Sequence, residues 1–97
     1  MLIVSGSFTL DPADRDAFVA GRLDAMRTTR TEAGCLEYVL SADPVDPARV
    51  VLLERWESQE AFDAHMVAVQ SAPRAVGPAP TGVSAVLYEI AGERTLA

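Results

Sequence analysis

Two side chains that each occur only once in this chain, Trp56 and His65, lie close together in the sequence. On a strand, Glu54 and Trp56 would share one face, because side chains alternate between the two faces of a strand. On a helix, Phe62 and His65 would share one stripe, because they are three residues apart. A helix that folds back over the strand would therefore bring a carboxylate, two aromatic rings and an imidazole around one cavity.

These residue types fit proton transfer to or from an aromatic compound. An imidazole is the side chain best suited to exchange a proton near neutral pH, so His65 is the candidate base. Glu54 would orient the imidazole and stabilise its charged form. Structural explanations stand beside these roles: His65 could be a hydrogen-bonded core residue, Glu54 its structural partner or that of an arginine, and Trp56 and Phe62 packing residues.

Four further side chains are candidates for substrate contact: Leu52, Met66, Arg22 and Tyr38. Arg22 would reach the cavity from the first helix or extend into solvent along that helix. Tyr38 would offer its phenol to the cavity or stand at its rim. Cys35 has no histidine or basic group beside it in sequence, and we expect it to be a packing residue.

The composition indicates one small, acidic domain. The 97 residues are 49% hydrophobic and can form one core. We expect a single domain over 1–97, with its core at about 2–90 and a tail at 91–97. The formal charge of −6 argues against nucleic acid and anionic membranes as partners. A lone Cys35, no signal-peptide pattern and no bilayer-length apolar run predict a cytoplasmic protein.

Missing residue types exclude several cofactor chemistries. Every basic residue is arginine, which excludes a lysine Schiff base and the P-loop lysine. One His and one Cys argue against a zinc or facial-triad iron site, so no metal is expected. The glycines never approach GxGxxG spacing, which argues against a dinucleotide fold. An enzyme built on this chain would work without a tightly held cofactor.

The apolar periodicity predicts six elements. Strands are expected at 2–10, 35–42, 49–57 and 83–90, and helices from Asp11 to about Arg30 and over 59–70. Asp11 and Pro12 would start the first helix, Gly34 would permit the turn that leaves it, and Ser58 would cap the second helix. The order β-α-β-β-α-β predicts a ferredoxin-like α+β fold, a four-stranded antiparallel sheet with both helices on one face.

The expected helices cover only one face of that sheet. Residues 35–42 and 49–57 are apolar on both faces, and side chains such as Val51, Leu53, Leu36 or Leu40, or their even- or odd-numbered counterparts, would occupy the open one. A large bare apolar face is unusual in a monomer. We therefore expect a symmetric homodimer that buries the face opposite Glu54 and Trp56.

The segment 32–66, EAGCLEYVLSADPVDPARVVLLERWESQEAFDAHM, resembles the antibiotic biosynthesis monooxygenase (ABM) domain family. The shared pattern is a Gly-Cys turn, a Tyr in the second strand, Glu-x-Trp ending the third strand, and a Ser-x-x-Ala-aromatic helix start followed by Ala-His. The resemblance implies a dimeric α+β barrel. Its members include cofactor-independent oxygenases of phenolic polyketides, quinol monooxygenases, haem-degrading enzymes and an isomerase.

The resemblance places Trp56 at the position of a Trp that lines the active cavity of the polyketide oxygenases. The anthrone-oxidising members have an Asn four residues before that Trp and a Tyr six after it, where this chain has Leu52 and Phe62. The haem-degrading members have an Asn in the first strand and a later axial His, and this chain has neither. His65 matches the first of two His found in quinol-type members.

The resulting hypothesis is a cofactor-free monooxygenase that acts on a quinol, anthrone or similar phenolic aromatic. His65 would remove a proton, Trp56, Phe62 and Leu52 would hold the ring, and the anion would react directly with O₂. Two alternatives remain: a non-catalytic dimeric protein that binds or shields a small molecule, and an isomerase of the same fold.

Overall fold

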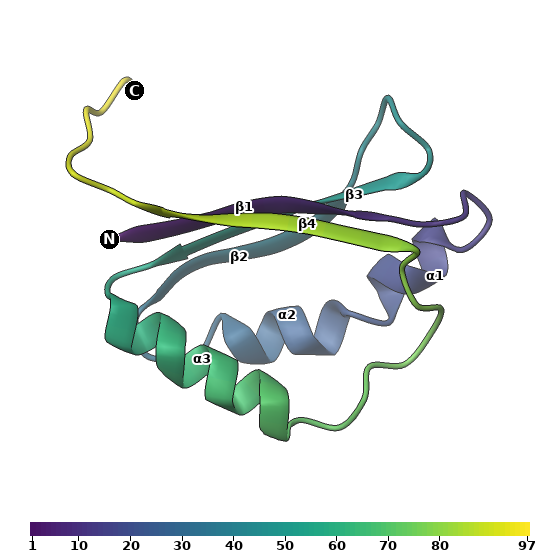
Figure 1. Ribbon diagram of the computed structural model, residues 1–97, viewed down its shortest axis with the longest axis horizontal. Coiled ribbons are helices and arrows are strands. Elements are labelled where there is room, and N and C mark those ends of the chain that lie inside the picture. The colour runs from purple at the N-terminus through teal and green to yellow at the C-terminus, as the bar shows by residue number, and fades with distance from the viewer.

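The computed structural model describes all residues of the chain, 1–97, as a sheet with a helical layer on one face (Figure 1). The elements in chain order are β1 (Leu2–Thr9), α1 (Arg15–Ala20), α2 (Leu23–Thr29), β2 (Cys35–Ala42), β3 (Arg49–Trp56), α3 (Gln59–Ser71) and β4 (Gly82–Glu89). The strands are all antiparallel and lie in the order β2-β3-β1-β4. The ferredoxin-like α+β prediction is confirmed, with β1 and β3 at the centre.

The first helical region differs from the prediction, because it is two short helices rather than one. Asp11 does not cap a helix; its carboxylate accepts a hydrogen bond of 2.9 Å from the backbone of Ala13 in a preceding turn. Gly21 ends α1, and a β-carbon at this glycine would clash with the carbonyl oxygen of Val76. The connection before β4 therefore packs closely against the break, where glycine also lowers helix propensity.

The predicted second helix is α3 in the structure, and it begins where the sequence signals indicate. Ser58 has extended backbone angles and its hydroxyl accepts a 3.2 Å hydrogen bond from the amide of Ala61, as an N-cap does. Gly34 has φ +80°, in the left-handed region that favours glycine, and its carbonyl accepts a 2.9 Å bond from Glu57. These two turns fix how α3 starts beside the strand that carries Trp56.

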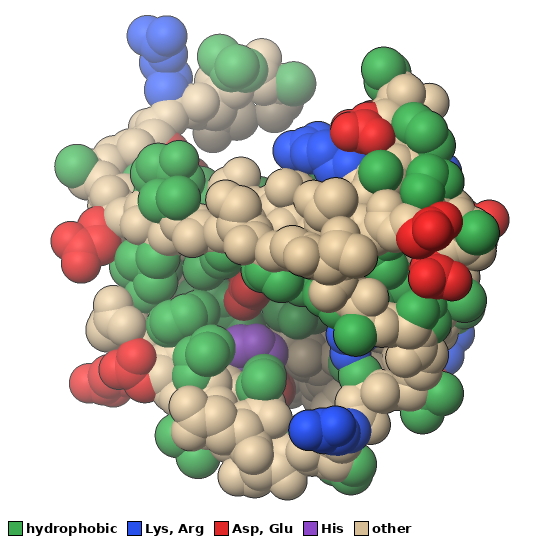
Figure 2. Space-filling view, turned by 45° about the vertical axis from the view of Figure 1, so that its right-hand side comes forward, with side chains coloured by type: hydrophobic (Ala, Val, Ile, Leu, Met, Phe, Trp, Pro, Cys, Tyr) green, Lys and Arg blue, Asp and Glu red, His purple; other side chains and the backbone are tan.

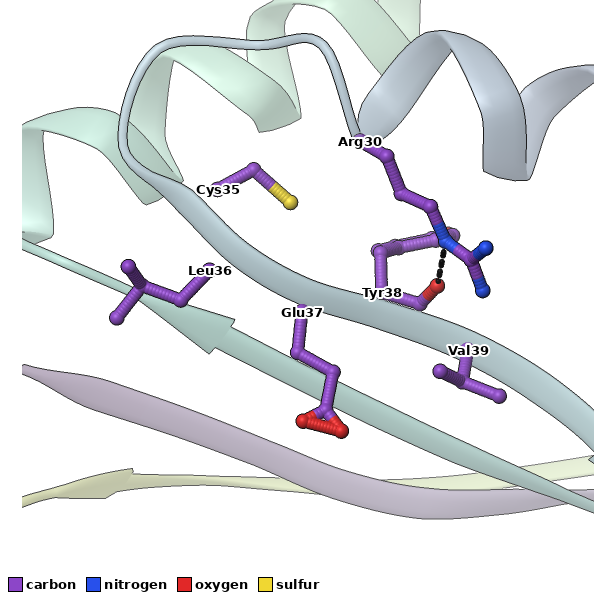
Figure 3. A pocket seen from close by; sticks show the side chains of 6 residues that line it. All are labelled: Arg30, Cys35, Leu36, Glu37, Tyr38 and Val39. Carbon is purple, nitrogen blue, oxygen red and sulfur yellow. Dashed lines mark hydrogen bonds between the residues drawn. The ribbon is translucent and has the colours of Figure 1, made fainter.

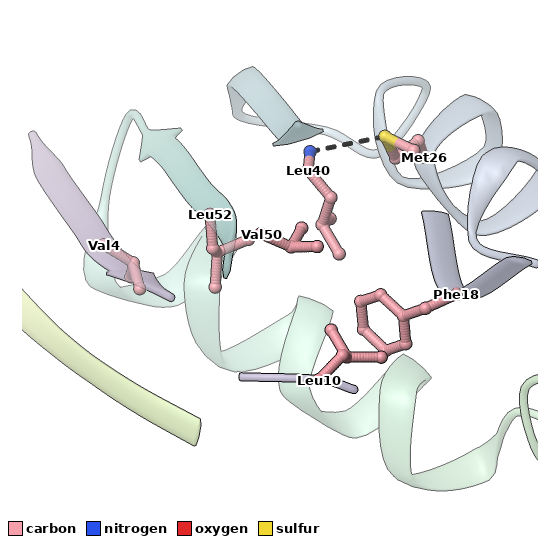
Figure 4. Close-up of a cluster of buried hydrophobic side chains, with 7 residues drawn as sticks. All are labelled: Val4, Leu10, Phe18, Met26, Leu40, Val50 and Leu52. Carbon is pink, nitrogen blue, oxygen red and sulfur yellow. Dashed lines mark hydrogen bonds between the residues drawn. The ribbon is translucent and has the colours of Figure 1, made fainter. Parts of the chain in front are cut away.

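The core lies between the helices and the inner face of the sheet (Figure 4). Its buried members are Val4, Leu10, Phe18, Met26, Leu40, Val50 and Leu52. On β3 the even-numbered residues are buried and the odd-numbered ones are only half-buried, so Glu54 and Trp56 face the helices. The amide of Leu40 also donates to the sulfur of Met26 at 3.4 Å, which ties β2 to α2.

The outer face of the sheet carries apolar side chains without a covering layer. It presents Ile3, Val39, Val51, Leu53, Val86 and Tyr88. Leu40, one of the side chains expected there, instead faces the helices at 6% exposure. The pairing of β2 with β3 shifts register between Cys35 and Glu37, so simple alternation from the start of the strand does not predict its faces. None of the helices is long and apolar enough to cross a membrane.

Candidate active site

The helical layer leaves one part of the inner sheet face uncovered. The helix α3 packs against β3, whereas Val83 on the inner side of β4 is 62% exposed. On α3, Met66 and Val69 are 38% and 49% exposed. Figure 2 shows the resulting hollow between sheet and helices, with the imidazole of His65 (purple) in its floor. The floor of an apolar hollow is a suitable place for one polar group to meet an apolar ligand.

The side chains of Trp56, Glu54 and His65 contact one another on the inner side of the hollow. The indole nitrogen of Trp56 donates a 3.0 Å hydrogen bond to Oε1 of Glu54. The rings of Trp56 and His65 are tilted at 32° with centroids 4.7 Å apart. The ring of Phe62 contacts Trp56 edge-on at 6.4 Å, and that of Tyr38 contacts His65 edge-on at 5.4 Å. The strand and the helix therefore bring together the side chains that the sequence singled out.

The carboxylate that bonds to the imidazole is Glu32, which the sequence analysis missed. Its Oε2 lies 2.8 Å from Nδ1 of His65, whereas Oε1 of Glu54 lies 3.9 Å from Nε2, too far for a hydrogen bond. Glu54 therefore does not hold the ring by a hydrogen bond, although its carboxylate lies close enough to stabilise a charged imidazole. Glu32 lies in the turn between α2 and β2, where no periodicity applies, and only its place within the ABM-like segment hinted at it.

The Nε2 atom of His65 is the imidazole atom available to a ligand. It makes no hydrogen bond, yet no fully buried side-chain nitrogen or oxygen in the structure lacks a partner. Part of the His65 side chain (purple) is visible in the hollow in Figure 2. His65 as a whole is only 3% exposed, so the surrounding protein fixes the direction in which Nε2 points.

Two titratable side chains near His65, Glu54 and Tyr38, have raised pKa values. Burial raises the pKa of Glu54, while the hydrogen bond from Trp56 and the charge of His65 act in the opposite direction. Burial and then the charge of Glu54 raise the pKa of Tyr38 to about 12. The phenol of Tyr38 therefore stays protonated at neutral pH and can donate a hydrogen bond, but it is not a base.

The other predicted contact residues lie in different surroundings. Leu52 belongs to the buried core, and Met66 on α3 is 38% exposed. The guanidinium of Arg22 lies 4.6 Å from the ring centroid of Phe18, a cation–π contact, rather than bonding to the imidazole. Trp56 is fully buried, so its indole packs under the imidazole and does not form an open wall.

Two surface pockets flank this group. A pocket of about 230 Å³ lies on the side of His65 that faces Glu32, between α3 and the turn before β2. Another, of about 320 Å³, follows the edge of β2 from Cys35 to Val39 (Figure 3). There Arg30 donates a 2.8 Å hydrogen bond to the carbonyl of Tyr38, on the free edge of the sheet. Burial, with Glu32 and Glu54 nearby, raises the pKa of the Cys35 thiol, as expected for a packing residue.

The fold is that of a small α+β protein with its one histidine in an apolar hollow, and comparison with known proteins identifies its family. The sequence model for "Antibiotic biosynthesis monooxygenase" (ABM) matches residues 1–70. This chain belongs to the antibiotic biosynthesis monooxygenase family. The resemblance noted in the sequence is thereby confirmed. No curated protein matches the chain.

Solved structures show the same fold over 90–98% of the chain. A Shewanella oneidensis protein is 28% identical, with 90% of this chain and 87% of that one covered and a TM-score of 0.76. Rv0793 of Mycobacterium tuberculosis is 29% identical, with 97% and 98% covered and a TM-score of 0.69. MhuD, a haem degrader of the same organism with two haems bound in its active site, is 19% identical, with 98% and 100% covered and a TM-score of 0.73.

Proposed function

We propose that this protein is a cofactor-independent monooxygenase of a quinol, anthrone or similar phenolic aromatic, with His65 as the base. The observation that carries the proposal is the imidazole at the floor of an apolar hollow, with Nε2 free of hydrogen bonds. Membership of the ABM family supports a monooxygenase-type reaction. An electron-rich phenolic substrate fits because its anion can reduce O₂ directly once a proton has been removed.

For an anthrone-type carbon, the proposed reaction converts CH₂ and O₂ into C=O and H₂O. Nε2 of His65 removes one proton, and the carbanion gives an electron to O₂, after which the two radicals join in a C–O bond. The peroxide anion recovers the proton from Nε2. Loss of the second C–H proton with cleavage of the O–O bond then releases water. The protein positions the ring, holds this proton and excludes solvent from the peroxide.

The apolar walls suit a flat, uncharged substrate. Met66 and Val69 on α3 and Val83 on the inner face of β4 offer exposed apolar surface, and Phe62 packs beside the buried Trp56. The two carboxylates near His65 would repel an anionic ligand. Tyr38 would donate a hydrogen bond to a substrate oxygen. Leu52, a core residue, and Arg22, which contacts the ring of Phe18, would support the substrate ring indirectly, through the packing of the core.

Haem, which MhuD binds and degrades, does not fit the residues of this chain. Iron coordination by histidine needs a ring nitrogen that can approach the iron directly. His65 is the one histidine here, and the first-strand Asn and the later axial His that the resemblance implies for haem-degrading members are both absent. The proposed reaction therefore involves no haem.

We also propose that the protein works as a homodimer in the cytoplasm. The uncovered outer face carries half-buried Val51 and Leu53 beside Val86 and Tyr88, which are 50% and 51% exposed. A second copy placed on this face would cover apolar side chains that otherwise contact water. The free Cys35 fits a reducing compartment.

Oxygen uptake tests the proposed function directly. The protein would be mixed with a panel of quinols and anthrones without added metal or cofactor, and O₂ consumption and product mass would be followed. We expect one substrate class to consume O₂ and its product to gain one oxygen atom. The Val67→Ala variant, changed at a 64% exposed position of α3, should keep full activity. Binding without O₂ uptake would favour the shielding protein, and a product of unchanged mass would favour the isomerase.

A further inference from the structure

The two nitrogens of the imidazole have different surroundings. Nδ1 lies 2.8 Å from a carboxylate oxygen of Glu32, within hydrogen-bond distance. Nε2 has Glu54 at 3.9 Å and makes no hydrogen bond. A carboxylate accepts hydrogen bonds and cannot donate one when it is ionised, so the Glu32 contact requires a proton on Nδ1. The neutral imidazole is then left with its lone pair on Nε2, the ring nitrogen that makes no hydrogen bond.

The two carboxylates near the ring also differ in their contact with water. The side chain of Glu32 is 25% exposed and lines the pocket of about 230 Å³ together with alanines of α3. The side chain of Glu54 is 9% exposed and already accepts the indole N–H of Trp56. Water can therefore hydrate the Glu32 carboxylate while it bonds to Nδ1, whereas Glu54 is enclosed by protein. Tyr38 of β2 is a further titratable side chain in contact with the ring.

We propose that Glu32 is the positioning residue of the site, which holds His65 in the tautomer that makes Nε2 the base. Glu32 does not touch the substrate. It fixes the direction of the ring, and it stabilises the imidazolium that forms when Nε2 takes the substrate proton. Glu54 instead holds Trp56 beneath the ring. This assignment rests on the proposed function for its catalytic part, but the tautomer itself is a property of the protein without substrate.

The tautomer is measured first, because it needs no substrate. His65 is the only histidine, so two-bond ¹H–¹⁵N spectra of labelled protein report on this ring without overlap. We expect the Nδ1-protonated tautomer in the wild type and in the Glu54→Gln control. In Glu32→Gln the amide can donate to Nδ1, so the ring should shift toward the Nε2-protonated tautomer.

The activity of the same variants supplies the second measurement. Glu32→Gln should lower kcat on the order of 10²-fold or more with little change in KM, since the wrong tautomer cannot accept the proton. Glu32→Asp should recover part of the loss, because it restores the carboxylate. Circular dichroism would show that each variant is folded, which is expected for a side chain that is 25% exposed.

The outcomes separate this inference from the proposed function. An Nε2-protonated ring in the wild type, or a folded Glu32→Gln protein with the wild-type tautomer and full kcat, would overturn the role of Glu32. If the wild type showed the expected tautomer, shifted in Glu32→Gln, but consumed no O₂ with any quinol or anthrone, the positioning of the ring by Glu32 would stand. In that case the proposed reaction would be rejected.

Discussion

The indole of Trp56 donates its hydrogen bond to Glu54, two residues earlier on the same strand, with a distance of 3.0 Å between Nε1 and Oε1. Both side chains are buried on the face of the sheet that meets the helices. A buried carboxylate is costly unless its oxygens are bonded, and a buried indole N–H also needs an acceptor. The indole N–H and the carboxylate each provide the hydrogen-bond partner that the other needs. The imidazole of His65 packs against the indole of this pair.

Removing this hydrogen bond should destabilise the protein. Trp56→Phe leaves Glu54 buried without its donor, and we expect a loss of about 1–3 kcal/mol in the free energy of unfolding beyond the effect of the smaller ring. Urea denaturation would measure it. In the Glu54→Leu variant, Trp56→Phe removes no hydrogen bond to a carboxylate. The loss in the free energy of unfolding should therefore be smaller there than in the wild type. Equal costs in both backgrounds would show that the bond contributes nothing.

Removing the proposed base should affect turnover more than substrate binding. With a substrate found by O₂ uptake, His65→Ala should lower kcat on the order of 10²–10⁴-fold, because a base acts in the transition state. Glu54→Gln should have a smaller effect, and Trp56→Ala must first be shown to be folded, since it could cost about 3–5 kcal/mol of packing. Full activity of folded His65→Ala would exclude His65 as the base.

The phenol of Tyr38 should make the protein less stable at alkaline pH. Its pKa is about 12 in the folded protein and 10.0 ordinarily, so its contribution is complete below pH 10 and is lost as the pH rises toward 12. By pH 11 the loss should be about 1 kcal/mol. Denaturation series at pH 9 to 11 would compare wild type with Tyr38→Phe, and the comparison cancels the contribution of Cys35, which both proteins share. Parallel curves for the two proteins would contradict the prediction.

The outer sheet face should mediate association in solution. Light scattering at micromolar concentration should give the mass of a dimer for the wild type. Leu53→Glu places a charge in the centre of that face and should shift the protein to monomer, because an unpaired charge is costly to bury. Val67→Glu, on an exposed part of α3, is the matched control and should remain dimeric. A monomeric wild type would refute the proposed homodimer.

The turn that carries Glu32 should depend on Gly34. This residue has φ +80°, and an added β-carbon would lie 2.5 Å from the β-carbon of Ala61 on α3. Gly34→Ala should therefore cost at least about 1 kcal/mol of stability, through backbone strain and displacement of the turn from the helix. Thermal unfolding would measure it against Gly92→Ala, where nothing lies within 4 Å. Equal melting temperatures for the two variants would show that the turn adapts freely.

Local sequence signals predicted most of the fold. Alternation along 49–56 placed Leu52, Glu54 and Trp56 on the helix-facing side, because strand periodicity is a property of the chain itself. The helix cap at Ser58 and the positive φ of Gly34 were likewise visible as residue types with particular backbone preferences. The break at Gly21 was missed because it depends on packing against Val76, a residue far along the chain.

The sequence by itself determined the element order, the family pattern and the meeting of Trp56 with His65, since spacing along one strand and one helix controls those. Tertiary structure alone decided which carboxylate bonds to the imidazole. Glu32 and His65 are 33 residues apart, and their 2.8 Å contact arises where the turn before β2 meets α3. No periodicity records such a contact, because it depends on how two separate elements dock, and docking is set by the packing of the whole core.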